Sequence, residues 1–281
     1  MPDTGTMRWN EKNGTPFLTF PSFDDLPFVR HAFSTRLGGV SEGVFSSMNL
    51  GFRRGDREEN VWENYRRICA AAGFDPQKLT ASSQDHHTVI RRVTTEQAGI
   101  GFTRPRDLES VDGLCTDTPG LTLVTYYADC VPLFFADKRT HAVGAAHSGW
   151  RGTVARIGAE MVRRMGEEFS SDPADLIVGI GPSIGPECYE VDQPVADQFL
   201  AMQDLDPERF VRPIGEGKYL LDLWECNRRV LASAGIPEEN ISCAQLCTKC
   251  HPDLLYSHRV MGAQRGNLAA MICRREDDWC T

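Results

Sequence analysis

The stretch that is most informative about the fold covers residues 142–153 and has the sequence AVGAAHSGWRGT. Its first five residues, Ala142–Ala146, form a short apolar run that predicts a buried strand. His147 ends this strand, and a Gly-rich turn then leads into a helix that we expect to begin at Thr153. A junction of this kind holds side chains rigidly and presents backbone N–H groups at a helix start, where anions bind. The stretch therefore predicts a strand–turn–helix unit with a candidate site at His147.

Other segments of the chain also predict buried strands or helices. Five further apolar runs predict buried strands: Phe28–Ser34, Leu121–Tyr126, Val131–Ala136, Leu176–Ile180 and Ala269–Ile272. Three segments with helical spacing of apolar residues predict helices: Arg57–Ala72, Thr153–Met165 and Leu223–Ala234. Strands and helices do not alternate regularly, as they would in a doubly wound fold. We therefore expect an α/β (α+β) fold with mixed sheets.

The ends of two helices carry recognisable signals. Asp56 is expected to cap the first helix, with Glu59 completing a capping box, and Gly73 is expected to end it. Asp222 stands at the start of the third helix, and Gly235 follows its end. These residues predict where the two helices begin and stop.

Length and composition are typical of a globular protein. The chain has 281 residues, of which 41% are hydrophobic and 25% charged, and it contains no internal repeat, low-complexity tract or long linker. We expect residues 1–281 to form a single catalytic domain. The net charge of −9 argues against general binding of nucleic acid or a membrane surface. Anionic ligands remain compatible with it, because a local field can oppose the net charge.

The location of the protein is inferred from two features. No apolar run reaches the roughly 18 residues of a membrane-spanning helix, and the N-terminal residues lack the apolar stretch of a signal peptide. We therefore expect a cytoplasmic protein. Most of its ten cysteines are then expected to be reduced core residues.

Three candidate metal ligands follow predicted strands. They are His86 in the run QDHH, Cys130 after Ala128-Asp129, and His147. Two imidazoles and one thiolate form a plausible zinc site that leaves a fourth position for water or substrate. Their separations of 44 and 17 residues match no short zinc motif. A buried free cysteine with two hydrogen-bonded histidines therefore remains the alternative on spacing alone.

A second candidate site combines Arg36, the pair Gly38-Gly39 and Asn49. Paired glycines permit a tight turn or a close ligand approach, and the planar guanidinium of Arg36 suits a phosphate or carboxylate. The alternative is an exposed arginine beside a turn.

Two further patterns resemble known motifs only in part. Residues 179–185, GIGPSIG, are not a dinucleotide-binding fingerprint, because the third glycine comes one position late and Pro182 stands where the helix would begin. Residues 247–251, CTKCH, have the form of a c-type haem attachment site. We expect no haem on Cys247 and Cys250, because attachment requires export. A redox or metal pair and two core thiols both remain open.

Several of these segments together resemble one family. The matching residues are Ser34-Thr35-Arg36 with Gly38-Gly39-Val40-Ser41, Asn49-Leu50-Gly51, Gln84 with His86, Ala128-Asp129-Cys130-Val131-Pro132, His147-Ser148-Gly149-Trp150-Arg151-Gly152, Gly179-Ile180-Gly181-Pro182, Cys188-Tyr189-Glu190-Val191, Asp222-Leu223-Trp224, Cys247-Thr248 and Ser257-His258-Arg259. The chain resembles the YfiH-like laccase-domain family, whose members are described as multicopper polyphenol oxidoreductases and as purine nucleoside phosphorylases. The resemblance implies that His86, Cys130 and His147 are the metal ligands. It also implies a fold similar to the catalytic domain of the cytotoxic necrotizing factors, with layered helices and mixed sheets.

The sequence of this chain departs from the family pattern at two places. His87 follows the first ligand where a small residue is common, and the stretch Gly262 to Gly266 fits loosely. No site residue is carried over from that stretch.

Three enzymatic functions are compatible with the candidate residues. A zinc-dependent purine nucleoside phosphorylase acting on adenosine or inosine, with adenosine deamination as a side activity, ranks first. Arg36, Arg151 and the helix start at Gly152 could bind its phosphate, and Asn49 its ribose or base. A copper-dependent polyphenol oxidoreductase ranks second, because seven histidines without an H-x-H pair are too few for a multicopper oxidase. Copper could still replace zinc.

The remaining alternatives rest on weaker grounds. A hydrolase with Cys130 as nucleophile and His147 as base ranks third, since it depends on fold analogy alone. A thiol that binds a metal is also not free to attack a carbonyl. A non-enzymatic role in binding a metal or a partner is the last alternative.

Overall fold

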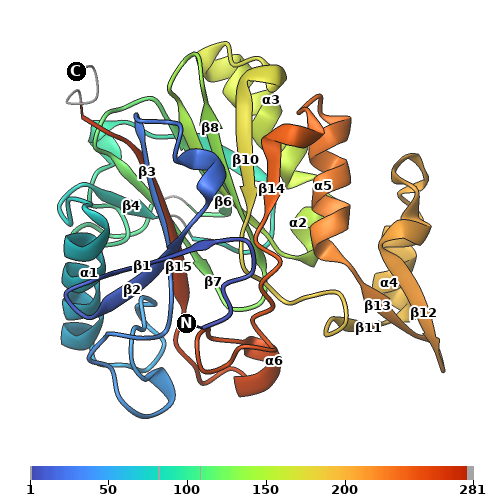
Figure 1. Cartoon of the computed structure of the whole chain (residues 1–281), viewed down its shortest axis with the longest axis horizontal. Coiled ribbons are helices and arrows are strands. Elements are labelled where there is room, and N and C mark those ends of the chain that lie inside the picture. The colour runs from blue at the N-terminus through green and yellow to red at the C-terminus, as the bar shows by residue number, and fades with distance from the viewer. Residues whose placement is uncertain (1, 82, 108, 277–281) are drawn as a thin grey trace.

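Two six-stranded sheets form the body of the protein (Figure 1). The structure is a computed structural model, and it describes residues 2–81, 83–107 and 109–276. The first sheet has the order β1 (Arg8–Lys12), β2 (Thr15–Thr19), β3 (Val29–Ser34), β15 (Leu268–Arg274), β7 (Thr122–Tyr127) and β4 (Leu79–Ala81). The second has the order β14 (Ile241–Cys243), β10 (Leu176–Ile180), β8 (Val131–Asp137), β9 (Val143–Ser148), β6 (Val111–Thr116) and β5 (Val89–Arg92). Each sheet contains both parallel and antiparallel pairs, so the predicted α/β fold with mixed sheets is confirmed.

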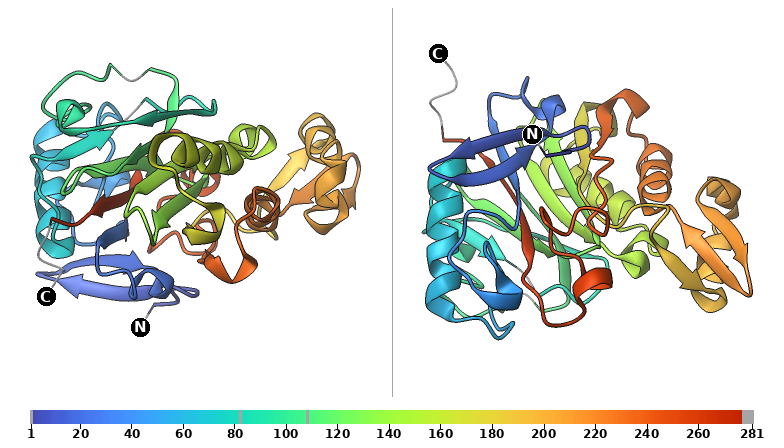
Figure 2. Two further views of the ribbon diagram at one scale, coloured as in Figure 1. Left: turned by 90° about the horizontal axis from the view of Figure 1, so that it is seen from above. Right: turned by 60° about the horizontal axis from the view of Figure 1, so that its bottom comes forward.

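The described residues form six α-helices, and the three longest of them cover the outer faces of the two sheets. The six helices are α1 (Glu58–Ala72), α2 (Trp150–Val154), α3 (Ile157–Phe169), α4 (Gln193–Leu200), α5 (Leu223–Ser233) and α6 (His258–Met261). Helix α1 packs on the first sheet, and α3 and α5 pack on the second (Figures 1 and 2). The sheets in turn pack on each other through one buried cluster that includes Phe33, Tyr127 and Phe134. The helices and sheets therefore form four layers.

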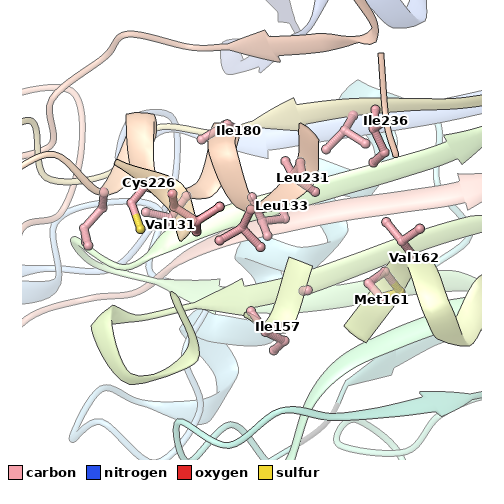
Figure 3. Packing of buried hydrophobic residues seen from close by; sticks show 14 of the residues in the cluster. Val131, Leu133, Ile157, Met161, Val162, Ile180, Cys226, Leu231 and Ile236 are labelled. Carbon is pink, nitrogen blue, oxygen red and sulfur yellow. The ribbon is translucent and has the colours of Figure 1, made fainter. Parts of the chain in front are cut away.

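Strand β8 shows why an inner strand can be continuously apolar. Val131, Leu133 and Phe135 belong to the cluster under α3 and α5, whereas Phe134 and Ala136 belong to the cluster between the sheets. Successive side chains of a strand point to opposite faces, so a strand covered on both faces needs apolar residues at every position. Figure 3 shows the helix side of this packing, with Leu231 of α5 beside Leu133.

A smaller lobe extends from the body. It consists of the antiparallel strands β11 (Glu190–Asp192), β13 (Lys218–Leu221) and β12 (Val211–Gly215) together with α4 (Figure 2). Phe199 and Phe210 of this lobe belong to the same buried cluster as Leu133. The lobe was not predicted from the sequence, because its strands are short and largely exposed.

The six predicted strands are all present, as β3, β7, β8, β9, β10 and β15, with ends that differ by at most two residues. The first and third helices are also confirmed. Gly73 adopts a left-handed φ of 82° at the end of α1, and the Asp222 side chain accepts a hydrogen bond from the Glu225 N–H at the start of α5.

Two predictions about helices are wrong. Asp56 does not cap α1, because its carboxylate accepts hydrogen bonds from Ser41 Oγ at 2.6 Å and Asn49 Nδ2 at 2.9 Å, and Arg57 takes the capping position instead. The helix expected over Thr153–Met165 begins earlier, at Trp150, and is interrupted at Arg156, whose φ is 59°. The chain turns there and restarts as α3.

In the described part of the chain, every helix is too short or too polar to cross a lipid bilayer. The nine described cysteines are all free thiols.

Candidate metal centre

The register of the second sheet brings two of the three predicted ligands together. Strands β8 and β9 are antiparallel and pair Pro132 with His147, so Cys130, just before β8, lies beside His147 near the end of β9. His86 comes from the loop between β4 and β5. The candidate ligand atoms of His86, Cys130 and His147 all lie within 4.8 Å of one another. The structure thus assembles the three residues that were proposed as ligands.

A buried carboxylate holds two of these residues in place. Asp112 of β6 is fully buried, and its carboxylate accepts a hydrogen bond from His147 Nδ1 at 2.8 Å. It also accepts the backbone N–H groups of Asp85, His86 and His87 at 3.2, 3.1 and 2.9 Å. One side chain therefore orients the His147 ring directly and the His86 ring through its backbone.

The contact with Asp112 fits His147 for a metal. Because Nδ1 donates to the carboxylate, Nε2 is the nitrogen left to bind a cation, and a carboxylate behind a ligating histidine is a recurrent feature of metal sites. Burial lowers the pKa of His147, but Cys130 and Asp112 more than offset it and raise this pKa to about 9. A cation must then displace a proton, so its affinity should fall as the pH is lowered.

The backbone around the candidate ligands has conformations that residues other than glycine rarely adopt. His86 has a φ of 70° and Asp129, next to Cys130, has a φ of 88°. Such conformations persist where surrounding contacts enforce them, and they cluster at functional sites. The Asp129 carboxylate accepts hydrogen bonds from Thr248 Oγ1 and from the Arg259 N–H, both at 2.6 Å.

The turn after His147 has no room for a side chain at position 149, which is a glycine. A Cβ atom at this position would lie 2.9 Å from His86 Nδ1 and 3.2 Å from Cys130 Sγ. Any side chain would therefore press on two of the three ligands. The glycine allows the start of α2 to pass directly over the cluster.

Two cavities meet at the cluster. The first has a volume of about 350 Å³ and is lined by His86 and Cys130 together with aromatic, apolar, basic and acidic residues, namely Ala128, Asp129, Trp150, Arg151, Ile184, Tyr189, Leu223, His258, Arg259 and Arg265. The second has a volume of about 360 Å³ and contains all three candidate ligands. Its other side chains include Arg53, Arg54, Gln84, Arg106, Tyr126, Arg265 and Asn267. We call them the aromatic cavity and the arginine cavity.

The arginine cavity is strongly positive. Four arginines line it, and none of its lining residues within the described part of the chain is a carboxylate. The buried Nε atoms of Arg54 and Arg265 have no hydrogen-bond partner among the described residues. Burial, followed by repulsion from Arg54, lowers the pKa of Arg265 to about 10. Guanidinium groups gathered without a carboxylate in the cavity lining could bind an anion.

The predicted substrate residues are placed less uniformly. Arg151 lines the aromatic cavity, where its guanidinium lies 4.3 Å from the centre of the Trp150 ring. Arg36 lines neither cavity, because its guanidinium donates to the carbonyls of Ser46 and Pro252. The structure therefore brings Arg151, but not Arg36, to the cluster.

Asn49 is also outside both cavities. It is fully buried, and its side-chain oxygen accepts the backbone N–H groups of Gly51 and Asn267, both at 2.9 Å. Its amide group donates to Asp56. Asn49 thus connects the loop before α1 with the segment before β15.

Sequence reasoning missed four residues of the site. Asp112 had a visible signal, since it is a lone acidic residue in the otherwise apolar stretch VDGLC. Arg54 follows the family motif Asn49-Leu50-Gly51 closely. Arg106 and Arg265 gave no signal, because they reach the cavity from loops distant in sequence.

Fold and site together define an α/β protein with a histidine–cysteine–histidine cluster that could bind a metal. The chain belongs to the family described as multi-copper polyphenol oxidoreductase laccase, whose model matches residues 30–275. The predicted resemblance is confirmed. Over 245 residues the chain is 37% identical to purine nucleoside phosphorylase YlmD of Bacillus subtilis, with 87% of this chain and 88% of that protein covered.

Two solved structures are similar over nearly their whole length. The crystal structure of YlmD from Geobacillus stearothermophilus matches with a TM-score of 0.88 and 36% identity, covering 97% of this chain and 100% of that one. The crystal structure of hypothetical protein YfiH from Bacillus licheniformis matches with a TM-score of 0.89 and 34% identity, covering 95% and 99%. The fold and the family are therefore established.

Replacing Cys130 tests the cluster. Cys130→Ala should lose the metal bound by His86 and His147 but keep its fold, because the buried clusters of the core do not depend on a metal. Elemental analysis after dialysis and circular dichroism measure the two properties. Wild-type metal content in this variant would contradict the assignment.

Asp112→Asn tests the carboxylate behind the ligands. The substitution conserves volume but replaces one acceptor oxygen with an N–H₂ group, so metal affinity should fall by about 10- to 100-fold. The matched control is Asp137→Asn, because Asp137 is equally buried and accepts the N–H groups of Arg139 and Thr140 away from the cluster. Equal losses of metal affinity in both variants would show that Asp112 acts only on general stability.

Proposed function

We propose that this chain is a cytoplasmic, zinc-dependent purine nucleoside phosphorylase that acts on adenosine and inosine. The observation that carries the proposal is the position of the three-ligand cluster between an anion-binding cavity and an aromatic cavity. Phosphorolysis needs both an anion and a nucleoside at one reaction centre. The names of the relatives, purine nucleoside phosphorylase, support the same activity.

In this proposal the arginine cavity binds phosphate. The side chains of Arg54, Arg106 and Arg265 converge there, and guanidinium groups match the geometry of phosphate oxygens. This local positive field explains how a chain with a net charge of −9 can use an anionic substrate.

The aromatic cavity is proposed to bind the nucleoside. Its volume of about 350 Å³ is within the range of small-molecule sites. Trp150 and Tyr189 offer aromatic surface for a purine, and Ile184 and Leu223 exclude water from it. Burial raises the pKa of Tyr189, so its hydroxyl keeps its proton and can donate a hydrogen bond to the base.

The proposed reaction transfers the ribosyl group from purine to phosphate. A phosphate oxygen forms a bond to C1′ as the C1′–N9 bond breaks, and the electron pair of that bond leaves with the purine, which takes up a proton. The arginines hold phosphate on one side of the sugar, and the aromatic cavity holds the base on the other. A zinc ion bound by His86, Cys130 and His147 would supply a Lewis acid.

The proposed site uses residues from all parts of the fold. His147 comes from the second sheet, whereas His86 and Cys130 lie in loops that lead from the first sheet to the second. Tyr126 comes from the first sheet, and Tyr189 from the segment that leads into the lobe. We therefore propose that residues 1–281 act as one catalytic domain. Nothing in this arrangement calls for a nucleic acid or a membrane as partner.

Copper-dependent phenol oxidation is the second candidate, because two imidazoles and one thiolate also bind copper. Against it stands the absence, within the described residues, of any group of three or more histidines that could form a trinuclear copper centre. A Cys130–His147 hydrolase is the third candidate, since these side chains lie side by side. Adenosine deamination is proposed as a side activity of the zinc form.

The deciding experiment compares zinc-loaded, copper-loaded and metal-free protein on inosine, adenosine and a phenol. The zinc form should release purine base and ribose 1-phosphate only when phosphate is present, and inosine formed from adenosine would reveal deamination. Base release without phosphate, giving free ribose, would favour a hydrolase. A zinc form inert toward every purine nucleoside, beside a copper form that oxidises phenols rapidly, would overturn the proposal.

Single substitutions of the arginines test the phosphate site. Arg54→Ala and Arg106→Ala should each raise the KM for phosphate by about tenfold or more, because a charge-assisted hydrogen bond contributes about 1.5–3 kcal/mol. The KM for inosine and the metal content should change much less. Arg36→Ala is the comparison variant: a larger effect on phosphate there than at Arg54 and Arg106 would place phosphate beside Arg36 instead.

A further inference from the structure

Three cysteines outside the catalytic cluster converge on one point. Cys188 lies on the segment between β10 and β11, and Cys247 and Cys250 lie on the segment that follows β14. The three sulfur atoms all lie within 4.8 Å of one another, and those of Cys188 and Cys250 are 3.4 Å apart. Residues some 60 positions apart in sequence thus present three thiols to a common centre.

The backbone fixes the two segments that carry these thiols. The Thr248 N–H donates to the Ser183 carbonyl at 3.0 Å, and the Ser183 N–H donates to the Leu246 carbonyl at 3.2 Å. Ser183 and Cys247 form an isolated parallel bridge between the segments. The thiols are therefore brought together by structure that forms without them.

One of the thiols is held by a hydrogen bond from the backbone. The Gly185 N–H donates to Cys247 Sγ at 3.1 Å, and hydrogen bonds of this kind orient the ligands of metal sites. A Cβ on Gly185 would lie 3.1 Å from both Cys247 Cβ and the Trp224 ring. Glycine is what allows the backbone N–H to approach the sulfur.

The three thiols differ in exposure, and the exposed one gives a cation a path to the other two. Cys247 is buried, Cys188 is partly buried and Cys250 is exposed. No fourth histidine, cysteine or carboxylate joins the group within the described residues. A cation bound there would have three sulfur ligands and an open position, which is compatible with zinc and, in trigonal form, with copper(I).

We propose that Cys188, Cys247 and Cys250 bind one thiophilic cation, Zn²⁺ or Cu⁺, at a site separate from the His86–Cys130–His147 cluster. Thiols must lose their protons to bind a cation, so binding releases protons and strengthens as the pH rises. This inference does not rest on the proposed reaction.

The thiol site is connected to the catalytic cluster through two short paths. Thr248, next to Cys247, donates to the carboxylate of Asp129, the neighbour of the ligand Cys130. Tyr189, next to Cys188, lines the aromatic cavity. A cation at the thiol site would therefore brace one wall of that cavity.

The test counts metal equivalents in purified, reduced protein loaded with zinc or, in a separate arm, with copper(I). Wild type should bind two equivalents of zinc, the double variant Cys188→Ser/Cys250→Ser one, and Cys130→Ser one. The control Cys243→Ser, which changes a partly buried cysteine outside both groups, should bind two. Two equivalents of copper(I) with only one of zinc would assign the thiol site to copper.

A second measurement on the wild type guards against misfolding of the variants. Loading should protect Cys188 and Cys250 from alkylation, as read by mass spectrometry, whereas the same residues react in metal-free protein. One equivalent of either metal in wild type, lost in Cys130→Ser and unchanged in the double variant, would overturn the proposal. Thiols that stay reactive after loading would also overturn it. The same holds if Cys188 and Cys250 form a disulfide in the purified protein and no second equivalent binds once that bond is reduced.

Discussion

The buried carboxylate of Asp112 is the interaction on which the site depends. It accepts one imidazole N–H from His147 and three successive backbone N–H groups from residues 85–87. A carboxylate removed from water is costly unless every acceptor position is used, and these four donors use them. The same contacts hold His86 at its left-handed φ and leave one nitrogen of His147 for a metal. Strand β6, which carries Asp112 between β5 and β9, thus links the fold to the chemistry.

The candidate metal cluster lies where two cavities of different character meet. An acidic protein concentrates positive charge at one place, where Arg54 and Arg265 remain close despite their mutual repulsion. The other cavity adds aromatic and apolar side chains, Trp150, Tyr189, Ile184 and Leu223, to its charged lining. In the proposed function, a cation held between them would have phosphate on one side and the purine on the other. This polarity fits the transfer of a sugar from a base to phosphate better than it fits the delivery of electrons to dioxygen.

The sequence was sufficient for the inner strands but not for the edges. Val131–Ala136 could be recognised because both faces of β8 are buried, whereas β6 was missed because Asp112 and Gly113 interrupt its apolar run. The break at Arg156 follows from tertiary packing, which helical periodicity does not contain. The three candidate ligands were predicted from the family motifs, because their spacing in the sequence is uninformative, and the structure brings them together. Arg265 could not be predicted, because only the folded loops bring it to the cluster.

The most direct test of the central claim is a crystal structure of zinc-loaded protein with phosphate, recorded at the zinc absorption edge. We expect an anomalous peak bonded to His86, Cys130 and His147, with tetrahedral density on the side of Arg54, Arg106 and Arg265. An empty three-residue cluster in fully loaded protein, or phosphate bound only beside Arg36, would contradict the account.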